Sequence, residues 1–416
     1  MKVLVCGAKG FVGAALCQRL ARAGHTVVKG VREPRSDDEI AIDYRRDLAV
    51  DQWLPKLVGI DAVVNAVGIL VERGSQRFDE IHRRAPMALF RACAAAGVQR
   101  VVQVSVLGAQ QGGTAYFDSK FAADTFLLTQ PIEWQIVRPA LIYGAAGKSA
   151  RLFRMLASLP VQALPAGGHQ PLQPVHIDDL TDVVAKLLEP STAARQCLDV
   201  VGATPVDFRE MMRTYRESMR LPATLSISIP GALIGAAAAV LDRVPGSTLT
   251  RETWRMLQHG NVGDPEPMTR LLGRSPRRID TFIQDDATAR NEALAAWRPV
   301  LLRGALACVW IGTALVSAFA YPTEDSLALL QRVHINGMGA WAALYGAILL
   351  DLLFGITTLT HPGRRLWALQ GALILTYSII IGIALPEFLS HPFGPVLKNL
   401  PILAILILLF SEETKR

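Results

Sequence analysis

The feature that most constrains the fold is an apolar segment at residues 2–6 that breaks into three glycines, Gly7, Gly10 and Gly13. Beyond Gly13, apolar residues recur at helical spacing, so the pattern predicts a strand, a tight turn and a helix. Gly7 permits a sharp exit from the strand, Gly10 lets backbone N–H groups approach a ligand, and Gly13 lets the helix pack closely on the sheet. Because a helix N-terminus carries partial positive charge, the turn predicts a diphosphate site. The residues of this site are Gly7, Gly10, Phe11, Val12 and Gly13.

The amino-acid composition differs between two regions of the chain. A chain of 416 residues suggests two or three domains. Its hydrophobic residues, 51% of the chain, are concentrated beyond about residue 297, where long apolar runs predict membrane segments.

The net charge of +7 comes without a basic run interleaved with aromatic residues, so we do not expect nucleic-acid binding. Five scattered cysteines lack metal-type spacing, so we expect reduced thiols and no metal site. The chain opens directly on a strand, so we expect no signal peptide.

The first 300 residues alternate between strands and helices. Helical stretches such as residues 85–96 separate the predicted strands, which lie at 26–32, 40–43, 59–68 and 101–105. The run at 101–105 is apolar at three of its five residues, Val101, Val102 and Val104, which is consistent with a strand buried on both faces. Such alternation predicts an α/β fold with a doubly wound parallel sheet.

The end of the second predicted strand indicates the cofactor. In dinucleotide sites an acidic residue there holds the free ribose hydroxyl, whereas arginine accommodates a 2′-phosphate. Here Arg32 and Arg35 follow the strand, which favours NADP, with NAD as the alternative if these arginines are only solvated loop charges. Asp43 or Asp47 is placed to bind the adenine amino group. The fourth strand ends in small residues that would let the backbone approach the cofactor, namely Asn65, Ala66 and Val67.

A chemical constellation follows the fifth predicted strand. Ser105 ends that strand, and Tyr116 and Lys120 come soon after at a spacing of i and i+4, on one helical face. An ammonium beside a phenol can lower the phenol pKa and also hold the nicotinamide ribose. A phenol so activated can exchange a proton with a carbonyl oxygen while hydride moves at carbon. This Tyr–Lys spacing is common in helices by chance. It indicates catalysis here because the pair follows the fifth strand of a predicted sheet whose first turn is glycine-rich.

These residues together resemble the extended or atypical short-chain dehydrogenase/reductases, over roughly residues 1–290. The branch most similar is the NAD(P)H-binding accessory subunit of respiratory complex I. The resemblance rests on the glycine turn, Asn65–Gly68, Ser105, Tyr116 with Lys120, residues 138–144 and residues 175–180. It implies a Rossmann domain with Ser105, Tyr116 and Lys120 catalytic, and with Lys120, Arg138 and Pro139 at the cofactor.

Two departures from that family bear on catalysis. Many extended members carry an asparagine for a proton relay where this chain has His82. His82 could substitute as a relay, the relay could be lost, or His82 could be a surface residue. Val106 and Leu107 also replace extra serines, so Ser105 must supply the hydroxyl alone. Part of this branch binds cofactor without known turnover, so cofactor binding is better supported than catalysis.

We expect an NAD(P)-binding domain over residues 1–296, with a substrate lobe at about 149–285, and a membrane domain over 297–416. An apolar stretch at 230–241 is too short to cross a bilayer. It could lie on the membrane surface or pack in the lobe, and we favour packing in the lobe.

The C-terminal domain contains four apolar stretches, at about 300–320, 338–359, 366–385 and 396–410. They predict an all-α bundle of four transmembrane helices. Basic residues favour the side of the reductase domain, so we expect both termini in the cytoplasm and the chain in the inner membrane. These basic residues are Arg298, Arg303, Arg364, Arg365, Lys415 and Arg416.

The segment 391–401 makes this half similar to the DoxX-like four-helix membrane module. Asp351 lies within the second predicted span, where an ionisable group is a functional candidate. Its partner could be Gln370, Tyr345 or Tyr377, and the alternative role is an interhelical hydrogen bond.

The sequence therefore favours a membrane-anchored NAD(P)H-dependent oxidoreductase that transfers hydride to or from a lipophilic carbonyl or quinone-type substrate. The expected partners are that small molecule and membrane lipid. A competing hypothesis is a non-catalytic NADP(H)-binding scaffold or redox sensor that docks a membrane protein complex. A nucleotide-sugar epimerase or dehydratase is allowed by the fold alone.

Overall fold

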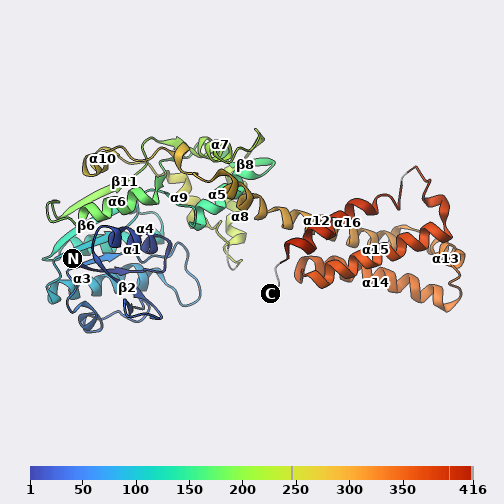
Figure 1. The fold of residues 1–416 in the computed structure, drawn as a ribbon, viewed down its shortest axis with the longest axis horizontal. Coiled ribbons are helices and arrows are strands. Elements are labelled where there is room, and N and C mark those ends of the chain that lie inside the picture. The colour runs from blue at the N-terminus through green and yellow to red at the C-terminus, as the bar shows by residue number, and fades with distance from the viewer. Residues whose placement is uncertain (245–246, 393, 414–416) are drawn as a thin grey trace. The chain divides into compact units, whose positions relative to one another are not determined.

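The computed structural model describes residues 1–244, 247–392 and 394–413. The chain divides into two compact units, Met1–Ala293 and Leu294–Arg416, and each is described by itself (Figure 1). The basic residues Lys415 and Arg416, used above to predict sidedness, lie outside the described residues.

A seven-stranded parallel sheet forms the centre of the N-terminal unit, in the order β11-β6-β5-β4-β1-β2-β3. Every residue of β4 and β5 is buried, as a parallel strand covered on both faces requires. The doubly wound α/β fold is thus confirmed. The strands are β1 (Lys2–Cys6), β2 (Thr26–Val31), β3 (Glu39–Ala41), β4 (Ala62–Asn65), β5 (Arg100–Val104), β6 (Glu133–Pro139) and β11 (Gln196–Val200).

Helices cover both faces of the sheet (Figure 1). One apolar cluster joins α1 and α6 to the sheet, and another joins α3 and α4 to its opposite face. The helices of this unit are α1 (Phe11–Arg22), α2 (Val50–Trp53), α3 (Ala85–Ala96), α4 (Ala115–Leu128), α5 (Lys148–Ser158), α6 (Ile177–Leu187), α7 (Phe208–Ser218), α8 (Gly231–Leu241), α9 (Arg251–His259), α10 (Glu266–Leu272) and α11 (Asp286–Ala295).

The far half of the sheet differs from the prediction. Residues 138–144 are expected from the sequence to form a sixth strand and turn, but strand β6 begins earlier, at Glu133. Only the short β7 (Ile142–Tyr143) follows it, paired with β10 (Val175–His176). Strand β11 was not predicted. Polar residues at 133, 135 and 196 interrupt the apolar pattern by which buried strands are predicted. Gln135 is nevertheless buried, because its side-chain amide donates to Ala193 O.

A smaller lobe follows the sheet and has its own apolar core, which includes Tyr143, Phe208 and Tyr215. Two strand pairs belong to it: parallel β8 (Val161–Pro165) with β13 (Leu225–Ile229), and antiparallel β9 (Pro171–Leu172) with β12 (Val206–Asp207). Helix α8 also belongs here, but Ala238 is the one buried residue among those described in it. The expectation that this apolar helix packs in the lobe is therefore wrong for most of its surface.

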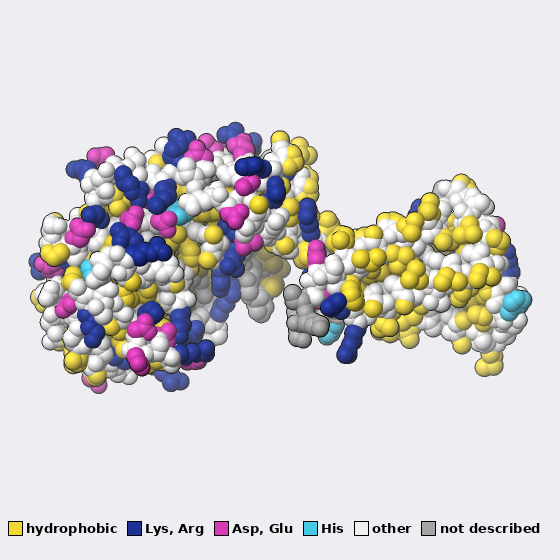
Figure 2. Space-filling model, in the orientation of Figure 1, with side chains coloured by type: hydrophobic (Ala, Val, Ile, Leu, Met, Phe, Trp, Pro, Cys, Tyr) yellow, Lys and Arg dark blue, Asp and Glu magenta, His cyan; other side chains and the backbone are white. Residues whose placement is uncertain are grey.

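The C-terminal unit has three helices that are long and apolar enough to cross a membrane, within the described ranges. They are Asp286–Ala320, which contains α12 (Arg298–Leu315), then α14 (Met338–Thr360) and α15 (Arg364–Ala384). A short α13 (Thr323–Arg332) joins the first two. Apolar side chains cover most of the visible face of this unit (Figure 2).

The fourth predicted span forms a shorter helix, α16 (Asn399–Glu412), of 14 residues. About 20 residues are needed to cross a bilayer as a helix, so three of the four predicted spans reach that length within the described residues, and the fourth crossing stays a prediction. Helix α16 nevertheless runs back along α15. Asn399 at its start donates to Ser378 Oγ, and Glu413 just past its end accepts a hydrogen bond from Trp367 Nε1 at 3.3 Å. Within this unit, the end of α16 therefore lies beside the start of α15.

Candidate functional site

The glycine turn between β1 and α1 has the predicted tight form. Gly7 has a φ of +82°, and Gly10 N donates to Gly7 O at 2.8 Å. A Cβ on Gly13 would lie 2.1 Å from Gly7 O, so no larger residue fits where the helix meets the turn. The first turn of α1 has no side-chain cap, so its N–H groups remain available as anion donors.

The two residues after Gly10 serve packing. A Cβ on Gly144 would lie 2.7 Å from the Phe11 ring, so Phe11 fills the space beside the turn after β7. Val12 packs against the apolar cluster between α1 and the sheet. Their backbone belongs to the turn, whereas their side chains hold it in place.

The loop after β2 leaves one arginine unpaired. Arg32 is exposed and forms no ion pair within the described residues. Arg35 lies 3.6 Å from Glu33, and its backbone N–H donates to Glu39 Oε2, which also pairs with Lys9 at 3.0 Å. Arg32 is thus the freer of the two predicted phosphate contacts.

Two predicted cofactor contacts are already engaged with protein groups. Arg45 pairs with Asp43 at 2.7 Å, and this hydrogen bond holds the Asp43 pKa below its usual value. Asn65 is buried, where its side chain accepts from Tyr44 Oη at 2.8 Å and donates to Gln103 Oε1 at 2.7 Å. The structure therefore places the Asn65 amide between strands, and leaves backbone atoms as the groups it could offer to a ligand.

The glycine turn and the Tyr–Lys helix meet at Val67, just beyond β4. A Cβ on Gly7 would lie 3.1 Å from Val67 Cγ2. From the other direction, Lys120 Nζ donates to Val67 O and to Val104 O, both at 3.2 Å. Burial lowers the pKa of Lys120 to about 8, opposed by the nearby Asp124 carboxylate. The predicted diphosphate turn and the predicted catalytic lysine are thus brought to one strand end.

Tyr116 lies one turn before Lys120 in α4, in an aromatic setting. Its ring centroid lies 5.4 Å from His82 and 5.9 Å from Phe78. Burial raises its pKa to about 12. The expected lowering by Lys120 is therefore not observed, because desolvation dominates and the Lys120 ammonium is bonded to backbone carbonyls. In this state the phenol is a proton donor.

The structure adds a residue that the sequence analysis missed. Asp124 continues the same helical face after Tyr116 and Lys120, and Ser105 Oγ donates to Asp124 Oδ2 at 2.6 Å. Burial raises the Asp124 pKa, while the Ser105 hydrogen bond and Arg138 oppose the rise. The continued four-residue spacing at 116, 120 and 124 was a signal that could have identified it.

Arg138 faces Asp124 and completes this cluster. Its Nε lies 3.7 Å from Asp124 Oδ2, and neither Arg138 Nε nor Asp124 Oδ1 has a hydrogen-bond partner among the described residues. Pro139 ends β6, and its carbonyl accepts from Leu107 N. The predicted cofactor contact Arg138 thus lies against the Ser105–Asp124 pair.

His82 is buried and neutral, so it is not a surface residue. It lies in a π-helical turn over Asp79–Arg84, and its Nε2 accepts from Ile69 N at 3.0 Å. Nδ1 must therefore carry the proton, which it donates to Ser119 Oγ at 3.0 Å. Ser119 in turn donates to Tyr116 O. Burial, then the charge of Lys120, lower the His82 pKa to about 2. His82 holds the backbone of Ile69 and Tyr116.

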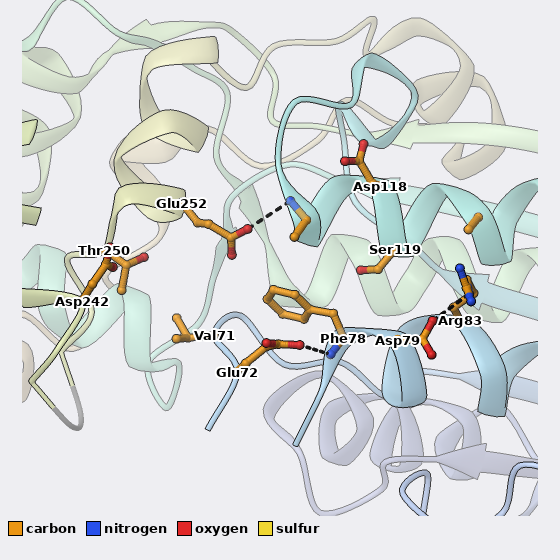
Figure 3. A pocket seen from close by; sticks show the side chains of 12 residues that line it. Val71, Glu72, Phe78, Asp79, Arg83, Asp118, Ser119, Asp242, Thr250 and Glu252 are labelled. Carbon is orange, nitrogen blue, oxygen red and sulfur yellow. Dashed lines mark hydrogen bonds and ion pairs between the residues drawn. The ribbon is translucent and has the colours of Figure 1, made fainter. Parts of the chain in front are cut away.

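A cavity of about 610 Å³ lies beside this helix (Figure 3). Phe78 and Ser119 line it on one side, and Asp242, Thr250 and Glu252 of the lobe line it on the other. The Glu252 carboxylate accepts from Ala115 N at 3.0 Å, so it ties the start of α9 to the start of α4. Burial raises the Glu252 pKa. The cavity thus lies between the Tyr116 helix and the lobe.

A second polar cluster lies in the C-terminal unit. Gln370 of α15 accepts from Trp310 Nε1 at 3.1 Å and donates to Thr358 Oγ1 at 2.8 Å. Asp351 of α14 is 7% exposed, and its Oδ1 has no hydrogen-bond partner among the described residues. The interhelical hydrogen bond considered for Asp351 is thus made by Gln370 instead.

Family comparisons identify the two parts separately. A family described as NAD(P)H-binding matches residues 7–159, and a DoxX-like family matches residues 307–407. The NADH-ubiquinone oxidoreductase 40 kDa subunit of Neurospora crassa is 24% identical over 300 residues, covering 67% of this chain and 76% of that protein. An uncharacterized protein of Mycobacterium tuberculosis is 32% identical over 194 residues, covering 45% of this chain and 20% of that protein.

Solved structures share the fold of the N-terminal unit. A nucleoside-diphosphate-sugar epimerase from Staphylococcus aureus has a TM-score of 0.56 at 18% identity, covering 68% of this chain and 100% of that one. The NADPH-dependent quinone oxidoreductase QOR2 from Escherichia coli, complexed with NADPH, has a TM-score of 0.55 at 15% identity, covering 68% and 98%. A short-chain dehydrogenase/reductase superfamily protein from Agrobacterium tumefaciens with bound NAD has a TM-score of 0.54 at 16% identity, covering 72% and 99%.

The chain therefore matches an NAD(P)H-binding family within its Rossmann-like N-terminal unit and a DoxX-like family within the C-terminal unit with apolar helices. The predicted cofactor class and the predicted pair of domain types are confirmed. The role of each site residue stays a prediction.

Proposed function

We propose that this chain is a membrane-anchored NAD(P)H-dependent reductase that acts on a lipophilic carbonyl or quinone-type substrate. The observation that carries the proposal is the meeting of the glycine turn and Lys120 at Val67. Tyr116 lies one turn from Lys120, and a cavity opens beside their helix. A diphosphate on the turn would direct the rest of a dinucleotide toward Lys120.

The proposed chemistry is reduction. A nicotinamide cofactor held by the glycine turn and Lys120 would supply the hydride to the carbonyl carbon, so the chain's own residues must supply the proton to the carbonyl oxygen as the C=O π bond breaks. Tyr116 transfers its proton to the oxygen, because its raised pKa keeps the phenol protonated at neutral pH. Lys120, on the same helical face, can stabilise the phenolate left behind only when its ammonium leaves the Val67 and Val104 carbonyls. Ser105 assists as a donor only when its hydrogen bond to Asp124 is exchanged, so Tyr116 carries the proton transfer.

The Tyr116→Phe variant tests this proposal. We expect turnover of a carbonyl substrate to fall at least about 100-fold, because the proton donor is lost, while NADPH affinity stays within about twofold. Tyr143→Phe is the control, since it removes a buried hydroxyl that contacts Arg154 in the lobe. Unchanged turnover in Tyr116→Phe would overturn the proposed chemistry.

We propose that NADP is the preferred cofactor because Arg32 is exposed and unpaired within the described residues. Arg32→Asp should lower the ratio of NADPH to NADH affinity by about tenfold or more, since it replaces a phosphate contact by a repulsive charge. Arg35→Ala is the matched control, because Arg35 faces Glu33. Fluorescence titration with both cofactors measures the ratio, and an unchanged ratio in Arg32→Asp contradicts the preference.

A second candidate function is a cofactor-binding scaffold that docks a membrane complex. The Ser105 hydroxyl is engaged by Asp124, which favours a structural role for that serine. The similar Neurospora crassa protein is named as a subunit of NADH-ubiquinone oxidoreductase. Tight NADPH binding without turnover on carbonyl or quinone panels, together with a copurifying complex, would favour the scaffold.

We propose that the N-terminal unit and the end of α16 lie on the cytoplasmic side of the inner membrane. Arg298 and Arg303 lie at the start of α12, and Arg364 and Arg365 start α15. Basic residues at these helix starts favour the cytoplasm. Cysteine accessibility from each side of sealed vesicles tests this orientation.

A further inference from the structure

Strand β13 is exposed at four successive residues, Leu225, Ser226, Ile227 and Ser228, and two of them are large and apolar. Leu225 and Ile227 are 66% and 47% exposed, although their neighbours in the strand are serines. Leu225 pairs with Val161 of β8, which is 43% exposed, and Ile227 pairs with Ala163. Paired residues of parallel strands share a face, so the ribbon turns an apolar face outward. A strand in water presents its polar face instead.

Helix α8 extends this surface without a break in the chain. It starts right after Pro230, and a Cβ on Gly231 would lie 3.6 Å from the Ala166 Cβ, just past β8. Leu233 and Val240 are 61% and 62% exposed. Helix α8 contains no polar residue at all, so it has no face suited to water. In Figure 1, α8 and β8 lie at the same end of the N-terminal unit. We call these exposed residues of β8, β13 and α8 the apolar surface.

We propose that the apolar surface docks on the lipid bilayer, with α8 in the interface. Its exposed side chains are aliphatic, and residues 225–241 contain no aromatic residue and no arginine. Protein interfaces concentrate their binding energy in Trp, Tyr and Arg, so this composition fits hydrocarbon better than a protein partner. A contiguous apolar surface of this kind indicates an interaction site.

The connectivity of the chain keeps the lobe close to a membrane. Ala289 and Ala293 of α11 belong to the same apolar core as Leu164 of β8. Two residues separate the end of α11 from the start of α12, the first helix of membrane length. The lobe that carries the apolar surface is therefore tethered directly to a membrane segment.

Docking would also give the cavity a lipid-side entrance. Asp242 follows the last residue of α8 and lines the cavity on the side opposite Ser119 (Figure 3). A lipophilic substrate could then move from the bilayer to the Tyr116 helix without crossing water. This second step rests on the proposed function, whereas the docking itself does not.

Spin labelling of the full chain in lipid nanodiscs tests the docking. Single cysteines replace Ile227, Leu233 or, as a control, the 77% exposed Val58. The background carries Cys197→Ser and Cys308→Ser, because the other native cysteines are buried. We expect labels at 227 and 233 to be several-fold more accessible to O₂, which partitions into lipid, than to a polar nickel chelate, with the reverse at 58.

Two results would overturn the docking. Labels at 227 and 233 that behave like the label at 58 would show that the surface faces water. Labels inaccessible to both reagents would show that protein covers it, whether the membrane unit of this chain or a second copy.

The lipid-side entrance has a separate test in the double variant Leu233→Glu with Val240→Glu. We expect turnover of a long-chain quinone dissolved in the bilayer to fall about tenfold, and turnover of a short-chain, water-soluble quinone to stay unchanged. An equal effect on both quinones would overturn the entrance. If the unaltered protein turns over neither quinone, the proposed function fails while the labelling result still decides the docking.

Discussion

Each unit of this protein contains a buried aspartate beside a candidate site, Asp124 in one and Asp351 in the other, and their surroundings differ. Asp124 in the Rossmann unit is 1% exposed and is surrounded by Ser105, Lys120 and Arg138. Asp351 in the membrane unit is 7% exposed, and its carboxylate has no hydrogen bond or ion pair within the described residues, whereas Asp124 lacks a partner only at Oδ1. A buried ionisable group without a partner costs stability and persists where function requires it.

The neighbourhood of Asp351 makes the contrast sharper. Gln370 of the same bundle has its amide oxygen and nitrogen bonded to Trp310 and Thr358. The bundle can therefore provide hydrogen-bond partners for a buried polar side chain that has only a structural role. The comparison teaches that Asp124 belongs to the architecture of its site, whereas Asp351 is a candidate for proton or ligand chemistry.

The largest expected effect is the loss of Asp124. Asp124→Leu leaves the half-buried Arg138 without its carboxylate and Ser105 without its acceptor, so we expect the N-terminal unit to lose about 3–5 kcal/mol of unfolding free energy. Denaturant unfolding of the full chain in detergent, followed by NADPH protection, measures the loss. Glu133→Leu is the control, because Glu133 pairs with Arg100 at the opposite end of β6 and is half-exposed. Equal losses of unfolding free energy in Asp124→Leu and Glu133→Leu would contradict the special structural role assigned to Asp124.

An intermediate effect is expected from pH at Lys120. Burial lowers its pKa to about 8 against 10.5 in the unfolded chain, so between these values the unfolded state binds more protons. Unfolding free energy should therefore rise with pH over this window, by up to about 1.4 kcal/mol per pH unit. Lys120→Met should remove this contribution, and the exposed Lys186→Met should not. Cys6 and Cys17 titrate in all three proteins, so the difference between variants isolates Lys120.

The smallest effects belong to the membrane unit and test the other side of the comparison. Gln370→Leu should cost roughly 0.6–1.7 kcal/mol, because two interhelical hydrogen bonds are lost. Asp351→Leu should be neutral or slightly stabilising, since it removes an unpaired polar group. Thermal unfolding in detergent distinguishes the two signs. A clear destabilisation by Asp351→Leu would mean that Asp351 has a structural partner after all.

The fold was largely predictable because its signals are local. The glycine turn, the apolar strands β4 and β5, and helix α3 follow from spacing within a few residues. The length of α16 was not predictable from hydropathy, because an apolar run can continue past the residues that form a helix. Strand β11 escaped because its polar residues find partners only across the sheet.

The sequence was sufficient to predict which residues form the candidate site, but it was less informative about the properties of each residue there. Tyr116 and Lys120 were placed on one helical face by their spacing, and Lys120 does reach the strand end where the glycine turn lies. The pKa of Tyr116 was predicted to fall, and it rises instead. Burial decides that sign, and burial depends on Phe78 and His82, which stand far from Tyr116 in sequence.

The sequence by itself therefore determined the two domain types, the parallel sheet and the cofactor class, because periodicity, glycine placement and apolar length act over short ranges. Only the tertiary structure decided that Asp124 accepts from Ser105, that His82 is neutral, that β13 and α8 turn an apolar surface outward, and that Asp351 Oδ1 has no partner in the part of the chain that the structure describes. These properties depend on which distant residues come together and which atoms lose water, and no local pattern carries that information.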